Sequence, residues 1–177
     1  MQVYLDENSV NMLPRTGRGT FLRTGSDIVI DLILAIAHHL AVFTLVAIFA
    51  AEFALLRPGL EGRRLGQLGA LDGAYGGVAG LVIVIGIVRV IFGAAGWEYY
   101  VGNWVFWAKM IAFLGVGLAS IPPTIAIARW RKTTKADAAF TPALAEVSAA
   151  RRFLYLQAGL LVFIPSFAAA MARGYGA

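Results

Sequence analysis

Five ionisable side chains lie inside long apolar stretches of this chain: His38, His39, Glu52, Arg89 and Lys109. Placing such a group in the hydrocarbon part of a bilayer costs a few kcal/mol or more. An ionisable residue at such a position is therefore a candidate functional residue. Imidazole is the usual protein ligand of haem iron, and cationic side chains bind the anionic haem propionates. His38, Arg89 and Lys109 therefore predict a b-type haem site, with His38 as the metal ligand.

The two histidines are adjacent, so they do not bind both faces of one haem within a single chain. The iron would have five ligands, or its sixth position would be completed by Lys109, by Met110 or Met171, or by another subunit. A bare transition metal is a poorer prediction, because two histidines and no cysteine do not form a conventional ligand set.

Helical phase distinguishes the two histidines. Asp31, His38, Leu45 and Glu52 are spaced by seven residues and so form one slowly drifting stripe. His39 points about 100° away from His38. Because a polar stripe is expected to face the interior of a bundle, we expect His38 to be the interior residue.

The same counting predicts the depth of the site and its neighbours. A helical rise of about 1.5 Å per residue places Arg89 about 6 Å and Lys109 about 8 Å inside the outer ends of their stretches. His38 and His39 lie about 11–15 Å below Asp31, also in the outer half. Two further polar residues share faces with these cations, Tyr75 with Arg89 and Ser120 with Lys109.

Each ionisable residue also has a structural interpretation. Arg89 and Lys109 could extend to the outer headgroups while their stems stay in lipid. A lone membrane histidine often serves as a hydrogen-bonding contact between helices. Glu52 is expected to pair with Arg57 or Arg63 near the cytoplasmic end, rather than to carry protons.

Four apolar stretches are long enough to cross a bilayer, which takes about 20 residues. They cover approximately residues 28–56, 72–93, 104–128 and 152–172. Their length favours helices, and the short connections make consecutive helices antiparallel. The sequence predicts an all-α fold, an integral membrane antiparallel four-helix bundle over residues 27–177. A polar tail, residues 1–26, precedes it and is expected to be disordered, and either Met1 or Met12 could be the start.

Composition supports this class. The chain is 59% hydrophobic and only 14% charged, more apolar than a soluble domain of 177 residues could bury. The absence of cysteine excludes a disulfide framework and a cysteine nucleophile. The net charge of +5 does not indicate nucleic acid, because the basic residues lie in the connections, where topology and lipid headgroups account for them.

The distribution of basic residues predicts orientation. Nine arginines and lysines lie in or beside the first and third connections, against four in the leading tail and at the end of the chain. The positive-inside rule therefore places those connections in the cytoplasm and both termini outside. Aromatic residues between Trp97 and Trp107 are expected to anchor the outer interface.

Glycine and proline positions predict how the helices pack. The overlapping small-residue spacings within Gly73–Gly80 predict that the second helix approaches a neighbour closely. Pro122, Pro123 and Pro165 predict kinks and free carbonyl groups that neighbouring helices must satisfy.

A succession of short motifs runs from Asp31 to Arg173. It includes His38-His39, Glu52-Phe-Ala-Leu-Leu-Arg57-Pro58, Gly86-Ile-Val-Arg89 and Asn103-Trp-Val-Phe-Trp107-Ala-Lys109. This succession resembles an uncharacterised family of four-span bacterial membrane proteins, labelled domain of unknown function 2214. The resemblance implies the four-span fold and brings no established activity.

The layout is also distantly similar to the copper-resistance D type membrane proteins and to the haem-containing membrane protoporphyrinogen oxidase. In the oxidase, a first-helix histidine and a lysine at the aromatic start of the third helix are tied to haem and activity. The matching positions are His38 or His39, and Lys109 after Phe106-Trp107-Ala108. The other motifs of the oxidase are not evident, so the resemblance does not imply protoporphyrinogen oxidation.

Three functions of different classes follow. The first is a haem b redox protein, with a membrane or redox partner subunit. The second is a non-catalytic membrane scaffold or assembly factor. Both of these functions are compatible with a homo-oligomer. The third is a small conduit for ions, protons or copper that uses Glu52, His38 and Arg89, although Met110 and Met171 are the main soft ligands for copper.

Overall fold

The computed structural model describes residues 25–93 and 96–176, and within these ranges the chain forms helices and no strands. In chain order they are α1 (Gly25–Leu55), α2 (Gly62–Phe92), α3 (Trp97–Gly102), α4 (Trp104–Ala136) and α5 (Leu144–Ala172). The four long helices are each long and apolar enough to cross a membrane. The predicted all-α, four-helix membrane bundle is therefore confirmed. Residues 1–24 of the predicted tail lie outside the described residues, and Gly25 and Ser26 already belong to α1.

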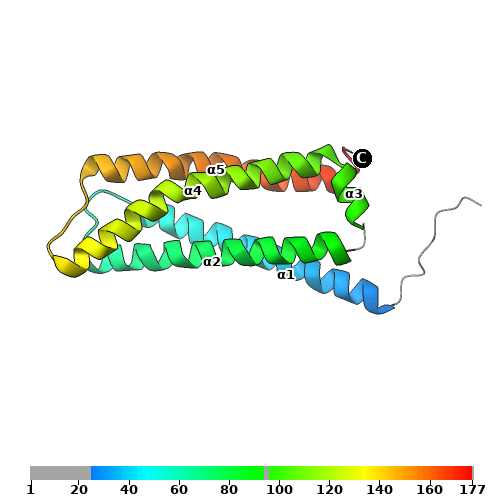
Figure 1. Ribbon diagram of the computed structural model, residues 1–177, viewed down its shortest axis with the longest axis horizontal. Coiled ribbons are helices and arrows are strands. Elements are labelled where there is room, and N and C mark those ends of the chain that lie inside the picture. Colours follow the sequence, from blue (N-terminus) through cyan, green and yellow to red (C-terminus); the bar gives the residue numbers. More distant parts are fainter. Residues whose placement is uncertain (1–24, 94–95, 177) are drawn as a thin grey trace, which may run out of the picture.

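The long helices run side by side along one axis (Figure 1). Packing proceeds in sequence, because α1 lies on α2, α2 on α4, and α4 on α5. The connections α1–α2 and α4–α5 meet at one end, called here the basic end for its arginines and lysines. The short helix α3, which was not predicted, lies at the opposite end with the described C-terminal residues (Figure 1). We call this the aromatic end, since Trp97, Trp104 and Trp107 are exposed there.

The helices extend further toward the basic end than predicted. Helix α2 begins at Gly62 rather than at residue 72, α4 continues to Ala136, and α5 begins at Leu144. The extra turns carry buried apolar side chains: Leu65, Leu68, Trp130 and Val147. Hydropathy marks where a helix contacts lipid, whereas these turns are stabilised by contact with each other.

The basic end also has polar ties. Arg129 of α4 pairs with Glu146 of α5 at 2.7 Å. The indole Nε1 of Trp130 donates a hydrogen bond of 2.9 Å to the other carboxylate oxygen of Glu146. A single carboxylate therefore joins both an exposed cation and a buried indole, which fixes the register of α4 against α5.

The continuous core stops before the aromatic end. Its outermost members on the first two long helices are Ala41 on α1 and Val82 on α2. Beyond them, Ile28, Leu32 and Ile36 of α1 are more than half exposed, as expected for side chains that face lipid. The core thus ends about one turn from His38 and two turns from Arg89.

The prolines are accommodated by a neighbouring helix. Helix α4 continues through Pro122 and Pro123. Because Pro123 has no N–H, the carbonyl group of Ala119 loses its normal partner four residues on. The side chain of Gln157 in α5 donates to that oxygen at 3.3 Å, which confirms that a neighbouring helix satisfies a carbonyl freed by proline.

The predicted close approach at the small-residue spacings of α2 is wrong for this chain. A side chain added at Gly73, Gly76, Gly77 or Gly80 would meet nothing within 4 Å, so this face is open. Close approaches occur instead at Gly69, where the Arg131 side chain lies, and at Gly86, beside His38. Spacing alone does not say which face of a helix its neighbour covers.

Candidate functional site

The two histidines of α1 differ as their phase predicts. His38 is half-buried, whereas His39 is exposed. The Nδ1 atom of His39 lies 2.7 Å from the carbonyl oxygen of Ala35, so this ring bonds to its own helix. Leu45 and Glu52, on the same stripe as His38, are 3% and 4% exposed. The stripe therefore faces the interior along most of its length.

His38 lies against α2 at a position without a side chain. Its Cε1 atom is 3.5 Å from the place that a Cβ atom of Gly86 would occupy. Arg89 follows Gly86 by three residues and so projects from the same face. Arg89 and Lys109 both lie close enough to interact electrostatically with His38, and with each other. We call these three residues, from α1, α2 and α4, the outer cluster.

Two polar atoms in the outer cluster lack partners. His38 Nδ1 and Arg89 Nε are buried and form no hydrogen bond with any described residue. Buried polar atoms are nearly always bonded, so such exceptions require an explanation such as an absent ligand. The Lys109 ammonium lies 5.3 Å from the centroid of the Phe106 ring on its own helix. The cluster thus offers positive charge and an imidazole to a group that is not part of the chain.

The start of α4, which carries Lys109, is fixed by a buried asparagine. The side chain of Asn103 accepts hydrogen bonds from the backbone N–H groups of Val105 and Phe106 at 2.9 and 3.3 Å. Its Nδ2 donates to the carbonyl of Tyr175 at 3.1 Å, and the residue is 0% exposed. Sequence reasoning missed this residue, although asparagine before an apolar run is a signature of a helix N-cap.

The proposed methionine ligands are not grouped with His38 by any described contact. Met110 is half-buried on α4. Met171 is buried near the end of α5, where its carbonyl accepts a hydrogen bond of 3.0 Å from the Tyr99 hydroxyl. At the outer edge of the region, Asp31 Oδ1 lies 3.3 Å from the Cβ position of Gly93. Of the suggested second iron ligands, Lys109 is the one that the structure brings to His38.

The predicted pairing of Glu52 with Arg57 or Arg63 is wrong. Glu52 is only 4% exposed and forms no ion pair with a described residue. It lies within electrostatic range of Asp72 and Tyr75 on α2 instead. Helix α1 ends at Leu55, so Arg57 lies exposed in the turn that follows, while Glu52 still follows the inward stripe.

Two polar contacts between helices lie near Glu52, which interacts electrostatically with Asp72 and Tyr75. The Tyr75 hydroxyl donates to Gln157 Oε1 at 3.4 Å, and Thr124 Oγ1 donates to Asp72 Oδ1 at 2.6 Å. Glu52, Asp72, Tyr75, Thr124 and Gln157 thus join four helices, and we call them the inner network. Asp72 lies ten residues after the start of α2, about 15 Å along the helix.

Sequence reasoning found only part of this network. It singled out Glu52 and Tyr75 but missed Asp72, Thr124 and Gln157. The feature that could have identified these three is that they are polar residues within or beside apolar stretches. Ser120 does not take part, because its hydroxyl donates to the carbonyl of Gly117 on its own helix at 2.7 Å.

The model of the family described as predicted membrane protein DUF2214 matches residues 30–176. The chain belongs to DUF2214. The match covers most of α1, all the later helices, and every residue of the outer cluster and of the inner network. No curated protein and no solved structure matches the chain. For this DUF2214 protein, the further resemblances to copper-resistance D type proteins and to the membrane oxidase remain predictions.

Proposed function

We propose that this DUF2214 protein is a membrane redox protein that binds b-type haem at the outer cluster. One observation carries the proposal: three helices bring His38, Arg89 and Lys109 together, and two of their buried nitrogen atoms have no hydrogen-bond partner among the residues that the structure describes. Bundle interiors commonly hold cofactors on side chains from facing helices.

The residues present fit such a group. His38 supplies an imidazole as the iron ligand, while Arg89 and Lys109 supply charges for the two propionates. The described residues contain no group of three or more His, Cys, Asp or Glu that could hold a metal ion. The donor set therefore suits a metal that arrives inside an anionic macrocycle better than a bare ion. When bound, haem would supply one-electron transfer, and Lys109 would hold either a propionate or, as the alternative, the iron opposite His38.

The arrangement in the membrane is part of the proposal. The nine basic residues of the connections and adjacent turns gather at the basic end, which supports placing that end in the cytoplasm of a bacterium. Both termini and the outer cluster then lie on the periplasmic side of the inner membrane, where a redox partner subunit would exchange electrons. A topology reporter fused near residue 136 is expected to report cytoplasm, and the reverse result would overturn this orientation.

The test is spectroscopic. Protein purified from haem-supplied membranes is expected to show a b-type Soret band that His38→Ala abolishes. His39→Ala is the matched control and leaves the band largely unchanged, because His39 is exposed and bonded to its own helix. Lys109→Met shifts the band if lysine completes the iron, and weakens haem retention if it binds a propionate. A folded, colourless preparation that takes up no added haemin would overturn the proposal.

A second candidate, a proton conduit, is favoured by the inner network. Glu52 is almost fully buried, faces Asp72, and has no hydrogen bond with a described residue. Such a carboxyl group in the membrane interior is typical of proton relays. Proton flux into liposomes that stops with Glu52→Gln, in a protein that stays folded, would establish this function. If neither haem nor flux is found, the scaffold function leads.

A further inference from the structure

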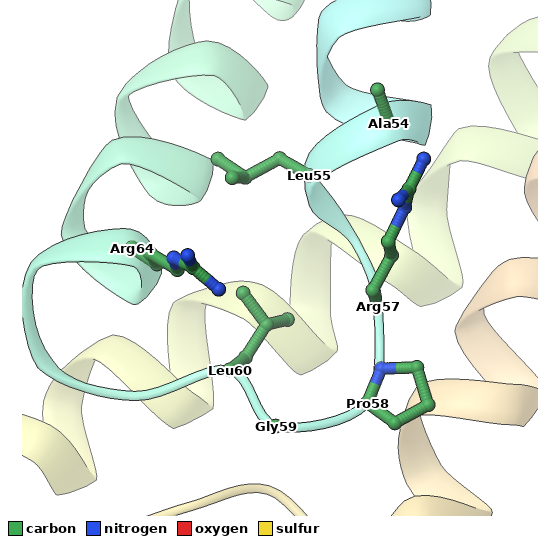
Figure 2. A pocket seen from close by; sticks show the side chains of 7 residues that line it. All are labelled: Ala54, Leu55, Arg57, Pro58, Gly59, Leu60 and Arg64. Atoms are coloured by element: carbon green, nitrogen blue, oxygen red, sulfur yellow. The ribbon is translucent and has the colours of Figure 1, made fainter.

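The turn between α1 and α2 forms a pocket at the basic end. The pocket has a volume of about 270 Å³ and is lined by residues that include Arg57, Leu60 and Arg64. Figure 2 shows the two arginines on opposite sides of this space, with Leu55 above it and Leu60 below. Neither guanidinium pairs with an acidic group among the described residues. The pocket therefore presents two unneutralised positive charges.

The turn that builds this pocket is held firmly in place. Leu56 and Leu60 are 0% and 2% exposed and anchor the turn in the core. Arg151 of α5 donates a hydrogen bond to the carbonyl oxygen of Leu56. Gly59 has φ +80°, a conformation that side chains disfavour, and it lets the chain reverse direction here. The pocket is thus preformed and does not depend on a ligand to order it.

An apolar groove adjoins the pocket. It has a volume of about 610 Å³ and lies between α1 and α2, with Ala51, Ala54, Leu55, Ala70 and Leu71 among its lining residues. Ala54 and Leu55 line both cavities, so the groove and the pocket lie directly beside each other. From the turn the groove follows the helices toward the middle of the bundle, and the alanines hollow out its surface.

We propose that the pocket and the groove together bind one anionic phospholipid. The phosphate group lies between Arg57 and Arg64, and an acyl chain lies along the alanine-lined groove. Arginine binds phosphate through charge-assisted hydrogen bonds, and basic pockets at the headgroup level of membrane proteins hold anionic lipids. The shape agrees with this chemistry, because a charged space at the interface lies directly beside an apolar one along the helices. The site lies at the basic end, whereas the outer cluster lies nearer the aromatic end, so the proposed lipid site does not depend on haem.

Native mass spectrometry with added phosphatidylglycerol, against phosphatidylcholine of the same acyl chains, tests the proposal. Phosphatidylglycerol is expected to bind more tightly. Each of Arg57→Gln and Arg64→Gln is expected to weaken its binding about 5-fold, and the double variant about 30-fold, at roughly 1 kcal/mol per arginine. Arg63→Gln is the matched control, since Arg63 is the exposed neighbour of Arg64 and does not line the pocket.

The groove is tested separately. Ala51→Leu fills part of it and is expected to weaken binding of the lipid, whereas Ala50→Leu, on the neighbouring exposed position outside the groove, leaves binding unchanged. Circular dichroism verifies that each variant stays helical. Equal losses for Arg63→Gln and Arg64→Gln would show non-specific charge attraction and overturn the proposal. So would glycerol phosphate that competes as well as the whole lipid, because the groove would then contribute nothing.

Discussion

The contact between Gln157 and the Ala119 carbonyl makes a quantitative prediction about the proline in α4. Gln157→Leu removes both of its hydrogen bonds, at 3.3 Å to Ala119 and at 3.4 Å from Tyr75. The carbonyl group is then left without a donor because Pro123 has no N–H. The variant Pro123→Ala supplies a backbone N–H four residues after Ala119, so the carbonyl no longer needs the glutamine.

The magnitudes follow from these two bonds. Both are long, and interhelical hydrogen bonds in membranes average about 0.6 kcal/mol, while an abandoned buried acceptor costs about 1–3 kcal/mol. We therefore expect Gln157→Leu to lower the free energy of unfolding by about 2 kcal/mol. In the Pro123→Ala background the same change is expected to cost about 1 kcal/mol, since only the Tyr75 contact is lost. The difference is a coupling of about 1 kcal/mol between positions 123 and 157.

A double-mutant cycle measured by reversible unfolding in mixed detergent micelles tests this reasoning. Gln67→Leu is the control, because Gln67 is exposed on α2 and makes no described hydrogen bond. Additive effects of Pro123→Ala and Gln157→Leu would refute the assignment of Gln157 as the replacement donor. A fully destabilised double variant would also contradict it, since the restored N–H is expected to rescue α4.

Four further changes have defined outcomes. Asn103→Ala removes the N-cap of α4 and is expected to lower stability by about 1 kcal/mol or more, measured as a reduced midpoint of thermal unfolding; no change would contradict its capping role. Gly69→Ala places a methyl group where Arg131 lies, and is expected to lower the midpoint, whereas Gly76→Ala meets open space and is expected to raise stability by about 0.5–1 kcal/mol. Glu52→Gln removes a carboxylate that faces Asp72, so it is expected to leave the unfolding free energy unchanged or higher at neutral pH; a clear loss would indicate a cationic partner after all.

The sequence correctly predicted the properties that depend on a single helix. Apolar length located four helices, and a spacing of seven residues separated the interior His38 from the exposed His39. Both properties depend only on the geometry of a single helix. The meeting of His38, Arg89 and Lys109 agrees with the similar depths that the helical rise predicted for them, although α1 extends beyond the outer ends of the other long helices (Figure 1).

Relations between helices were harder to predict. Arg57 is the cation nearest to Glu52 in sequence, yet α1 ends between them and the six-residue connection 56–61 sets the register of α2. That register places Asp72 and Tyr75, rather than an arginine, opposite Glu52. The sequence also did not predict which face of α2 packs against a neighbouring helix. Glycine spacing shows where a close approach is sterically possible, but not whether another helix lies there.

The early end of the core on α1 and α2, at Ala41 and Val82, has a consequence for where the bundle can open. Parting the basic end would expose Leu65, Leu68 and Trp130, all within 1% of complete burial. Parting α1 from α4 near the outer cluster exposes little apolar surface that lipid does not already cover. Separating α1 from its neighbours near the outer cluster is therefore expected to cost less free energy than opening the basic end. A flat lipophilic molecule dissolved in the bilayer would reach His38 by lateral diffusion, so its rate of entry would depend on the fluidity of the membrane.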